Sequence, residues 1–313
     1  MIQLKIQGRT GNQFFQHAFV SNYIIENNLD EIIYVSFENL KKQKCSDESF
    51  KNELTNFKIN NIKEINKVKF QGNQRIYDFI YKVINKLIRL NAKIKKRKLT
   101  QKDYDFLIKF LQKKLNTNGL YYYIPGMKEL YKSKTNNIIF FGYYEENRYY
   151  TKNKEVNFKN YTPVKKEKKE NESLYNIIKG KNSVCITIRR GDFLNPRFIK
   201  NHYICTTEYF EKAIEKMNTL IQEPQYIVFS DDIDWCKKNM KFPPNTKFES
   251  GKDPIWEKIR LMYSCKHFII SNSTFSWWAQ YLSRNENKIV IAPKEWNKFE
   301  YADLIYDKDW ILI

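Results

Sequence analysis

The chain has 313 residues and a mass of 38.0 kDa, and 42% of its residues are hydrophobic, which is enough to fill one large or two ordinary globular cores. Its formal net charge of +20 implies an anionic partner and leaves nucleic acid, membrane lipid and a phosphorylated substrate open. The sequence has no signal-peptide pattern and no uncharged apolar stretch near the ~18 residues of a membrane span, so we expect a cytoplasmic protein.

Cysteine usage bears on the compartment. Five cysteines are scattered along the chain without a CxxC pair, and Cys185 lies in an apolar run. An odd number of cysteines and an apolar setting both favour free thiols over a disulfide framework. We therefore expect a reducing environment, such as the cytoplasm.

The N-terminal half begins with the pattern of an α/β unit. Residues 1–7 alternate apolar and polar residues and predict a strand, the GRTGN stretch predicts a turn, and the following FFQHAFVSNYIIENN has helical spacing. Residues 31–36 and 136–142 predict two further strands. The first half of the chain is therefore expected to contain a sheet with at least one covering helix.

A basic segment interrupts this half. Residues 81–116 contain twelve Lys or Arg and two Asp, and their pattern is helical. One interpretation is a solvated amphipathic helix or pair of helices, with leucines and isoleucines inward and lysines outward. The other is electrostatic adhesion to an anionic membrane that carries a lipid-linked partner. Nucleic-acid binding is not expected, because no nucleic-acid motif accompanies the charge.

The C-terminal half has a regular strand–helix alternation. A polar, highly charged stretch around Pro163 predicts a boundary between domains of residues 1–162 and 163–313. After it, apolar strands and helical patterns follow one another in the order SVCITI, TTEYFEKAIEKMNTL, QYIVFS, WCKKNM, KHFIIS, NSTFSWWAQYLS and KIVIAP. Such alternation predicts a parallel sheet covered by helices on both faces, so this domain is expected to be Rossmann-like.

Three polar clusters directly follow predicted strands of the C-terminal domain. They are residues 189–192, 230–232 and 271–276. In an open α/β sheet the carboxyl ends of the strands line the ligand crevice. We therefore expect the three clusters to converge on one site.

The chemistry of two clusters suits phosphate. Arg189 and Arg190 would be costly at the end of a buried strand without an anion, and guanidinium groups bind phosphate in a bidentate manner. The alternative is that one arginine pairs with Asp192 in a turn. Residues 271–276 carry four hydroxyls and an amide where a helix should begin, which predicts a second phosphate contact together with an ordinary helix N-cap.

The acidic cluster leaves two interpretations open. Asp231 and Asp232 can accept hydrogen bonds from a ribose or a guanine. Asp232-Ile233-Asp234 also has the DxD spacing by which some enzymes hold a divalent metal on a diphosphate. Because the arginines already supply positive charge, we favour nucleoside contact, and Asp234 best fits an N-cap.

Four segments resemble the motifs of a known family. In order and spacing, GRTGNQFFQ, TIRRGDF, FSDD and NSTFSWWAQYL, which begin at residues 8, 187, 229 and 272, are similar to the four motifs of bacterial alpha-1,2-fucosyltransferases, glycosyltransferase family eleven. GYYEENRYY, CTTEYFEKAI and IAPKEWN extend the similarity over nearly the whole chain. The basic segment and the linker resemble the family least.

The resemblance implies a GT-B architecture, in which two Rossmann-like domains face a central cleft. It implies inverting transfer of L-fucose from GDP-β-L-fucose to the 2-hydroxyl of a terminal galactose in a surface glycan, with no metal or other cofactor. The implied catalytic residues are Arg189, which neutralises the β-phosphate as GDP departs, and Asp192. The implied donor-binding residues are Gly11, Asn12, Gln13, Thr187, Arg190, Ser230, Asp231, Asp232, Asn272, Ser273, Thr274 and Ser276.

The sequence departs from the family pattern at two positions. The family usually has His where this chain has Thr187, and GGLGNQ where this chain begins its first motif with Gly8-Arg9-Thr10-Gly11. The first departure weakens one expected nucleotide contact. Because a hydroxyl can still donate or accept a hydrogen bond, we interpret it as tuning of activity rather than loss.

The acceptor side is less defined by the sequence. Tyr144, Glu145 and His202 lie in segments expected to reach the acceptor, and Asp192, Glu145 and His202 are candidates to take the proton of its hydroxyl. Two rival hypotheses remain. One is a different transferase, either a metal-dependent one for another nucleotide sugar, with Asp232 and Asp234 as ligands, or a fucosyltransferase of different linkage. The other is a basic nucleic-acid-binding or membrane-binding protein with a vestigial sugar pocket.

Overall fold

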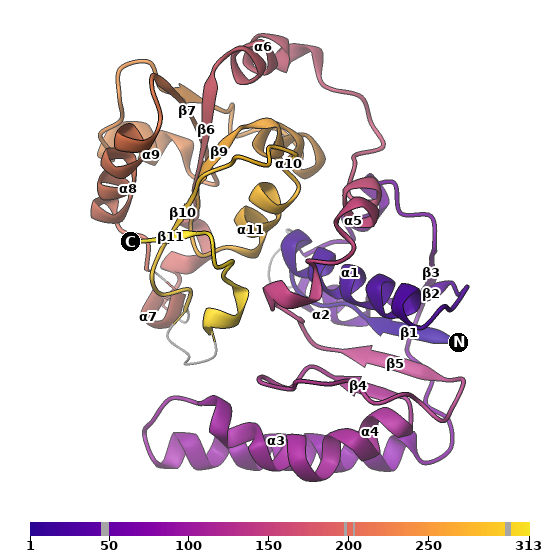
Figure 1. The fold of residues 1–313 in the computed structure, drawn as a ribbon. Coiled ribbons are helices and arrows are strands. Elements are labelled where there is room, and N and C mark those ends of the chain that lie inside the picture. Colours follow the sequence, from indigo (N-terminus) through magenta and orange to yellow (C-terminus); the bar gives the residue numbers. More distant parts are fainter. Residues whose placement is uncertain (45–49, 197–198, 203, 298–301) are drawn as a thin grey trace. The chain divides into compact units, whose positions relative to one another are not determined.

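The computed structural model describes residues 1–44, 50–196, 199–202, 204–297 and 302–313 (Figure 1). These residues form two compact units. The described residues of unit 1 fall within Met1–Thr55, Ile59–Lys154 and Phe299–Leu304, and those of unit 2 fall within Asn56–Lys58, Glu155–Lys298 and Ile305–Ile313. Each unit is built on a parallel sheet with helices, which confirms the predicted α/β class.

The division at Lys154 and Glu155 falls earlier in the sequence than the predicted one at residues 162 and 163. The segment between them is charged but carries buried side chains that pack within unit 2. Asn157 donates a hydrogen bond of 2.9 Å to the Tyr281 hydroxyl, and the ring of Tyr161 packs edge-on against Trp278 at 4.9 Å. These contacts explain why the segment belongs to the second unit.

Unit 1 contains a five-stranded sheet of order β3-β2-β1-β5-β4 in its described residues, and all strand pairs are parallel. The strands are β1 (Ile2–Lys5), β2 (Ile33–Ser36), β3 (Ile62–Ile65), β4 (Leu120–Tyr122) and β5 (Ile138–Phe141). Its helical elements are α1 (Thr10–Glu26), α2 (Glu38–Lys44), α3 (Gln74–Ile94), η2 (Gln101–Tyr104), the π-helical η3 (Leu107–Gln112), α4 (Lys113–Thr117) and η4 (Asn147–Tyr149). The predicted strands near residues 31–36 and 136–142 are confirmed as β2 and β5.

Unit 2 contains a six-stranded sheet of order β11-β10-β9-β6-β7-β8 in its described residues, again parallel throughout. The strands are β6 (Asn182–Ile188), β7 (Pro224–Ser230), β8 (Lys247–Phe248), β9 (His267–Ile269), β10 (Val290–Ala292) and β11 (Ile311–Leu312). Its helical elements are α5 (Lys154–Asn160), η5 (Lys169–Asn171), α6 (Glu172–Gly180), η6 (Gly191–Leu194), α7 (Ile199–His202), α8 (Thr207–Leu220), α9 (Ile233–Asn239), α10 (Ile255–Ser264) and α11 (Thr274–Tyr281). Two short turns, η1 (Leu54–Asn56) and η7 (Ala302–Ile305), lie where the chain passes between units.

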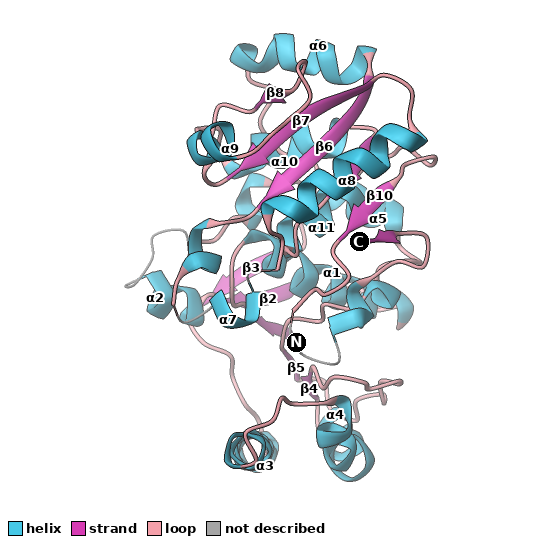
Figure 2. Ribbon diagram, turned by 90° about the vertical axis from the view of Figure 1, so that its left-hand side faces the viewer, coloured by secondary structure: helices cyan, strands magenta, loops and turns pink. Residues whose placement is uncertain are grey.

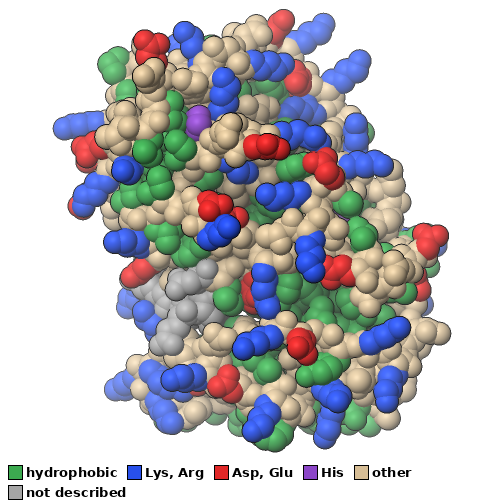
Figure 3. Space-filling view, viewed as in Figure 1, with side chains coloured by type: hydrophobic (Ala, Val, Ile, Leu, Met, Phe, Trp, Pro, Cys, Tyr) green, Lys and Arg blue, Asp and Glu red, His purple; other side chains and the backbone are tan. Residues whose placement is uncertain are grey.

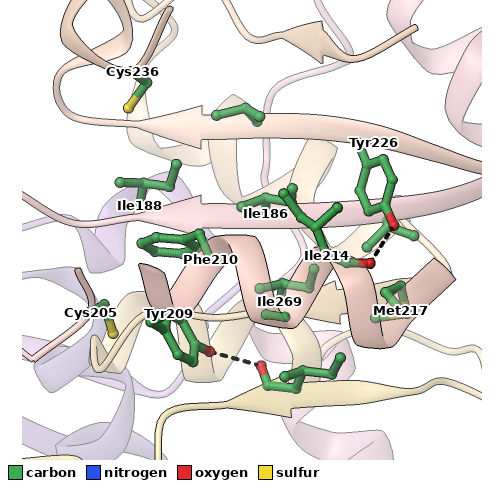
Figure 4. Close-up of a cluster of buried hydrophobic side chains, with 14 of the residues drawn as sticks. Ile186, Ile188, Cys205, Tyr209, Phe210, Ile214, Met217, Tyr226, Cys236 and Ile269 are labelled. Carbon is green, nitrogen blue, oxygen red and sulfur yellow. Dashed lines mark hydrogen bonds between the residues drawn. The ribbon is translucent and has the colours of Figure 1, made fainter. Parts of the chain in front are cut away.

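The core of unit 2 packs helix α8 against its sheet. Helix α8 places Phe210, Ile214 and Met217 against side chains of β6, β7 and β9 (Figure 4). Two buried tyrosines satisfy their hydroxyls within this core, because Tyr209 donates to the Ile270 carbonyl at 2.8 Å and Tyr226 to the Ile214 carbonyl at 3.3 Å. Buried hydroxyls with partners avoid the cost of unpaired polar groups.

The cysteines in the described residues are free. Cys185, Cys205, Cys236 and Cys265 are all buried, and Cys45 lies outside the described residues. Burial raises the pKa of the Cys205 thiol to about 12 and that of Cys185 well above its usual value. The Cys185 and Cys205 thiols are therefore protonated at neutral pH.

The basic segment differs from its predicted form. Its main helix, α3, begins at Gln74, and Figure 2 shows it end-on beside α4. Leu87 and Leu90 of α3 face outward, which contradicts the prediction of leucines and isoleucines facing inward. The prediction holds for the rest of the segment, where Ile84 and Ile88 are half-buried and Leu107, Leu111 and Leu115 are buried. Two polar side chains of α3, Gln74 and Asp78, are buried as well. Within the ranges that the structure describes, no helix has the length and apolar character needed to span a bilayer.

Candidate functional site

The three predicted clusters of unit 2 meet at one edge of its sheet. Strand β6 lies between β7 and β9, and all three run parallel, so their carboxyl ends are adjacent. The last residue of β6, Ile188, is in register with Ser230 at the end of β7. The segments that begin at Arg189, Asp231 and Ser271 therefore leave the sheet side by side, as the sequence predicts.

The two arginines after β6 pair with the two aspartates after β7. Arg189 Nη1 lies 2.8 Å from Asp231 Oδ2, and Arg190 Nε lies 3.6 Å from Asp232 Oδ2. The Asp231 carboxylate also accepts the backbone N–H of Arg190 at 2.9 Å. Asp231 and Asp232 are therefore the observed partners of the arginines. The sequence analysis gives Asp192 as an alternative partner for one of them. The side chain of Asp192 lies outside the described part of the chain, so its catalytic role stays a prediction.

Arg190 is held in an unusual setting. Its guanidinium carbon lies 3.1 Å from the centroid of the Trp235 ring, and its side chain is only 11% exposed. Its buried Nε makes no hydrogen bond within the described residues. Asp232 balances the charge from 3.6 Å without accepting a hydrogen bond, and a buried N–H that is left unsatisfied is costly. An acceptor on an anion bound here would remove that cost. The geometry thus fits an anionic ligand at the end of β6.

The hydroxyl-rich loop before α11 is braced from within. The backbone N–H of Ser271 donates to Thr187 Oγ1 at 3.1 Å, and the hydroxyls of Ser271 and Ser276 lie 3.3 Å apart. Both hydrogens of the Asn272 amide are used, on the carbonyls of His202 at 2.8 Å and Trp296 at 2.9 Å. Thr187, Asn272 and Ser276 are buried and hold the loop in place, and their direct contact with a donor stays a prediction.

Ser273 and Thr274 are the parts of this loop that reach the surface. Both are only partly buried, and Thr274 begins α11. The first backbone N–H groups of a helix lack intrahelical partners and favour a negative charge. These two residues therefore remain the candidates for ligand contact in the cluster, beside the arginines of the neighbouring strand.

The acidic cluster has a structural task as well. Asp232 Oδ1 accepts the backbone N–H of Trp235 at 3.2 Å and so caps α9, whereas Asp234 lies in the first turn; the predicted N-cap role of Asp234 is wrong. Ser230, also buried, accepts the backbone N–H of Asp232 at 3.0 Å. No group of three or more His, Cys, Asp or Glu side chains suited to a metal occurs in the described residues.

A fourth loop reaches the same edge of the sheet, and the sequence analysis missed it. Residues 249–253 follow β8, the neighbour of β7, and Glu249 donates its backbone N–H to the Val228 carbonyl at 3.0 Å. Glu249 is buried and pairs with Lys258 at 3.3 Å. Because β8 has two residues, no apolar run marks it in the sequence. The short GKDP stretch after it was the available signal.

In unit 1, the first motif also follows a strand end. Gly8, with φ of +77°, makes the turn after β1, and Gly11 lies in the first turn of α1. Gln13 is fully buried and uses its whole amide: it donates to the carbonyls of Gly8 and Lys51 and accepts the backbone N–H of Glu53. Gln13 therefore fixes the turn, and its predicted donor contact stays a prediction. Asn12 and Gly11 stay predictions.

The predicted acceptor residues of unit 1 follow β5, the neighbour of β1. Tyr144 is fully buried, stacks on Phe19 at 3.8 Å and donates to the Tyr121 carbonyl at 2.6 Å, so it packs in the core, and its acceptor contact stays a prediction. Glu145 beside it is partly exposed, and desolvation raises its pKa to about 7. A carboxyl with a pKa near neutrality can exchange a proton under physiological conditions.

His202 lies in unit 2, at the end of α7. Its ring centroid lies 5.5 Å from that of Phe193, and its carbonyl accepts a hydrogen bond from Asn272. The structure therefore connects His202 to the hydroxyl-rich loop. Its contact with an acceptor stays a prediction.

Comparison with known proteins fits this geometry. The family model described as glycosyl transferase family 11 matches residues 1–313. The chain belongs to glycosyl transferase family 11. The first motif after β1, the arginine pair after β6 and the hydroxyl-rich loop before α11 are thus parts of a family 11 enzyme.

Curated relatives of this family 11 chain are sugar transferases. The alpha-1,2-colitosyltransferase of Escherichia coli is 35% identical over 185 residues, which cover 56% of this chain and 61% of that protein. The O-antigen biosynthesis glycosyltransferase WbnK of Escherichia coli is 37% identical over 123 residues, which cover 38% of this chain and 41% of that protein. A galactoside alpha-(1,2)-fucosyltransferase 1 of Saimiri boliviensis boliviensis is 23% identical over 137 residues, which cover 41% of this chain and 37% of that protein. Each alignment spans less than two thirds of the relative.

A solved structure shows the same fold. The NodZ alpha-1,6-fucosyltransferase co-crystallised with GDP matches with a TM-score of 0.51 and 13% identity, covering 89% of this chain and 91% of that one. The likeness confirms the expected GT-B type, built from two Rossmann-like units. That the units face each other across a cleft stays a prediction.

Proposed function

We propose that this family 11 enzyme transfers L-fucose from GDP-β-L-fucose to the 2-hydroxyl of a terminal galactose, with inversion and without a metal. The observation that carries the proposal is the arginine pair after β6, in which a buried Arg190 Nε lacks an acceptor. Such a pair fits a diphosphate leaving group. Alpha-1,2 linkage and fucose appear in the names of its relatives.

The proposed mechanism rests on stabilising the departing GDP. As the bond to the sugar breaks, negative charge grows on the β-phosphate, and donors already in place stabilise it without reorganisation. Arg189 and Arg190 would supply two guanidinium groups, and Ser273, Thr274 and the first amides of α11 would supply further donors from the adjacent loop. Asp231 holds both arginine residues in position, through one side chain and one backbone N–H.

The acceptor is proposed to be a surface glycan of the O-antigen, lipopolysaccharide or capsule type, free or lipid-linked, on the cytoplasmic side. Support comes from the O-antigen biosynthesis named for one relative. The direct test is turnover of GDP-fucose with a panel of β-galactosides, with and without EDTA, and NMR of the product linkage. An EDTA-resistant alpha-1,2-fucosyl product is expected. EDTA-sensitive transfer would instead favour a metal-dependent enzyme that uses Asp232 and Asp234.

Colitose is the second candidate sugar, because the relative with 35% identity is named a colitosyltransferase. Colitose is L-fucose without its 3-hydroxyl, so the choice depends on whether a protein group bonds that hydroxyl. A site that hydrogen-bonds a substrate hydroxyl strongly rejects the analogue that lacks this hydroxyl. A site without such a bond rejects the analogue that carries the hydroxyl only weakly. Competition between GDP-fucose and GDP-colitose in one assay therefore decides the donor. Preference for GDP-colitose would overturn the fucose assignment and leave the diphosphate site intact.

Gly191→Ala tests the geometry of the arginine pair. A Cβ at Gly191 would lie 2.6 Å from Asp231 Oδ2, the oxygen that pairs with Arg189. The methyl group must displace this carboxylate, so we expect GDP to bind about tenfold more weakly, a loss of ~1.4 kcal/mol, as measured by calorimetry. Gly180→Ala is the matched control, since a Cβ there meets nothing within 4 Å. Unchanged GDP affinity in Gly191→Ala would contradict the proposed site.

Glu145 gives a pH prediction. With a pKa of about 7, its carboxylate fraction rises about tenfold between pH 6 and pH 8, and so should kcat/KM if Glu145 takes the acceptor proton. Glu145→Gln should remove this rise of kcat/KM with pH. If kcat/KM still rises with pH in the variant, the base is Asp192 or His202 instead.

The same group makes a prediction about stability. Its pKa is raised above 4.5, so the folded protein binds this proton more tightly than the unfolded chain does. The free energy of unfolding should therefore fall as pH rises from about 4.5 through about 7. Glu145→Gln should lack this dependence and be more stable than wild type at pH 8. Thermal melts at pH 5 and pH 8 measure the difference directly, independently of any catalytic role.

A further inference from the structure

Helix α3 presents an apolar face to solvent. Its six outward apolar residues are Ile76, Phe79, Val83, Leu87, Leu90 and Ile94. The exposure is large, at 67% for Phe79 and 71% for Ile94. At 1.5 Å per residue this face is about 27 Å long. A continuous exposed apolar surface of this kind marks an interaction site rather than ordinary surface.

The rotation of α3 is fixed by its polar side. Gln74 donates to the carbonyls of Asn118 at 2.8 Å and Asn137 at 2.6 Å. One turn later, Asp78 accepts the hydroxyl of Tyr122, and Tyr81 stacks on the same ring at 3.8 Å. These anchors lie on one side of the helix. Turning the apolar face inward would break buried hydrogen bonds, so its exposure is a property of the folded unit.

A basic flank runs beside the apolar face. At 100° per residue, the basic residues of α3 fall in a single sector next to the apolar one. They are Arg75, Lys82, Lys86, Arg89 and Lys93. Figure 3 shows blue Lys and Arg side chains beside green hydrophobic ones along the edge where α3 lies. The acidic residue of the helix, Asp78, is buried and pairs with Lys82 at 2.6 Å.

We propose that this face of α3 docks on a membrane surface that contains anionic lipids. Helices that lie in a membrane interface combine an apolar face with lysines and arginines beside it. The spacings along the apolar face are three and four residues and average the 3.6 of a straight helix, which suits a flat surface better than the 3.5 of a coiled-coil seam. The adjoining segment adds two exposed aromatics, Phe106 and Phe110, packed at 5.0 Å.

Charge decides between a membrane and a second copy of the chain. Another copy of α3 would bring the same five basic residues and no exposed acidic partner, so like charges would face each other. An anionic lipid surface complements the flank, at ~1 kcal/mol, or about fivefold in binding, for each basic residue near the headgroups. The apolar face and the basic flank thus favour the same occupant.

The test is co-flotation of the full chain with phosphatidylcholine vesicles and with mixed phosphatidylcholine–phosphatidylglycerol vesicles, at low and high salt. Binding is expected with the mixed vesicles, weakening as salt is raised. Phe79→Asp with Leu87→Asp should abolish it. Because both side chains are already exposed, folding should be unaffected, and Leu220→Asp on α8, at 41% exposure in the wild type, is the matched control.

Charge substitutions separate the two parts of the surface. Lys86→Gln, Arg89→Gln and Lys93→Gln together should lower binding on the order of a hundredfold. Lys212→Gln with Lys216→Gln on α8 should leave it unchanged. Binding to phosphatidylcholine alone that is insensitive to salt would overturn the proposal. So would a dimer in light scattering that the α3 variants dissociate, with no vesicle binding, because the face would then hold a second copy.

Discussion

Arg189→Ala is expected to lower kcat for sugar transfer by about 10² to 10³, by analogy with removal of one preorganised donor from an oxyanion hole. In the folded protein Arg189 lies at the end of β6, with its guanidinium set 2.8 Å from Asp231. Asp231 thus holds a guanidinium at the strand end where the diphosphate is proposed to lie. The loss should appear mainly in kcat, because negative charge on the leaving group is greatest in the transition state.

Initial rates at saturating donor, together with GDP affinity from calorimetry, measure this effect. Arg284→Ala serves as the control, since Arg284 is an exposed arginine beyond the end of α11 that pairs loosely with Glu155 at 3.7 Å. Turnover in Arg189→Ala equal to that of the control would refute the leaving-group role. Retained GDP binding with lost turnover would support it, because the variant must then be folded and able to hold the nucleotide.

Glu257→Ala is expected to destabilise unit 2 by about 3–5 kcal/mol, the usual consequence of leaving a buried charge unpaired. Glu257 is fully buried and accepts from Arg260 at 3.0 Å, Asn171 at 3.1 Å and the backbone N–H of Lys168 at 3.1 Å. The carboxylate therefore joins α10 to the segment before α6. Removing it would leave Arg260, itself 7% exposed, without its anionic partner.

Urea unfolding followed by tryptophan fluorescence measures this effect. The control is Glu208→Ala, where an exposed carboxylate pairs with Lys212 at 2.6 Å one turn away, and no measurable change is expected. Glu257→Leu combined with Arg260→Met should recover much of the stability, because neither charge is then left alone. If Glu257→Ala unfolds at the wild-type urea concentration, the buried network contributes nothing to stability.

What the sequence can predict in this protein follows from local pattern. Apolar runs marked β6, β7 and β9, and the polar residues directly after them, among them Arg189 and Asp231, lie at one sheet edge, as parallel topology requires. Strands without such a run, such as the two-residue β8, were not found. Local pattern thus suffices for most of the sheet of unit 2 and for the position of its site.

Pairings between distant segments could not be predicted. The rotation of α3 about its axis depends on the contact between Asp78 and Tyr122, which are far apart in the sequence, so the outward position of Leu87 could not be read from the periodicity of the helix. Gln13 matches a family motif, yet its amide nitrogen donates hydrogen bonds to the backbone carbonyls of Gly8 and Lys51. A motif identifies the residues of a site, and the hydrogen bonds of the fold decide which of them face a ligand.

The contact between Arg190 and Trp235 gives the protein an optical reporter. The guanidinium lies against the face of the indole, and the emission of an indole depends on charges held against its ring. A diphosphate that draws Arg190 toward itself would change that contact. Tryptophan emission should therefore shift on addition of GDP, and this GDP-induced shift should be absent in Trp235→Phe. Nucleotide binding can then be followed in real time, without a label and before any sugar acceptor has been found.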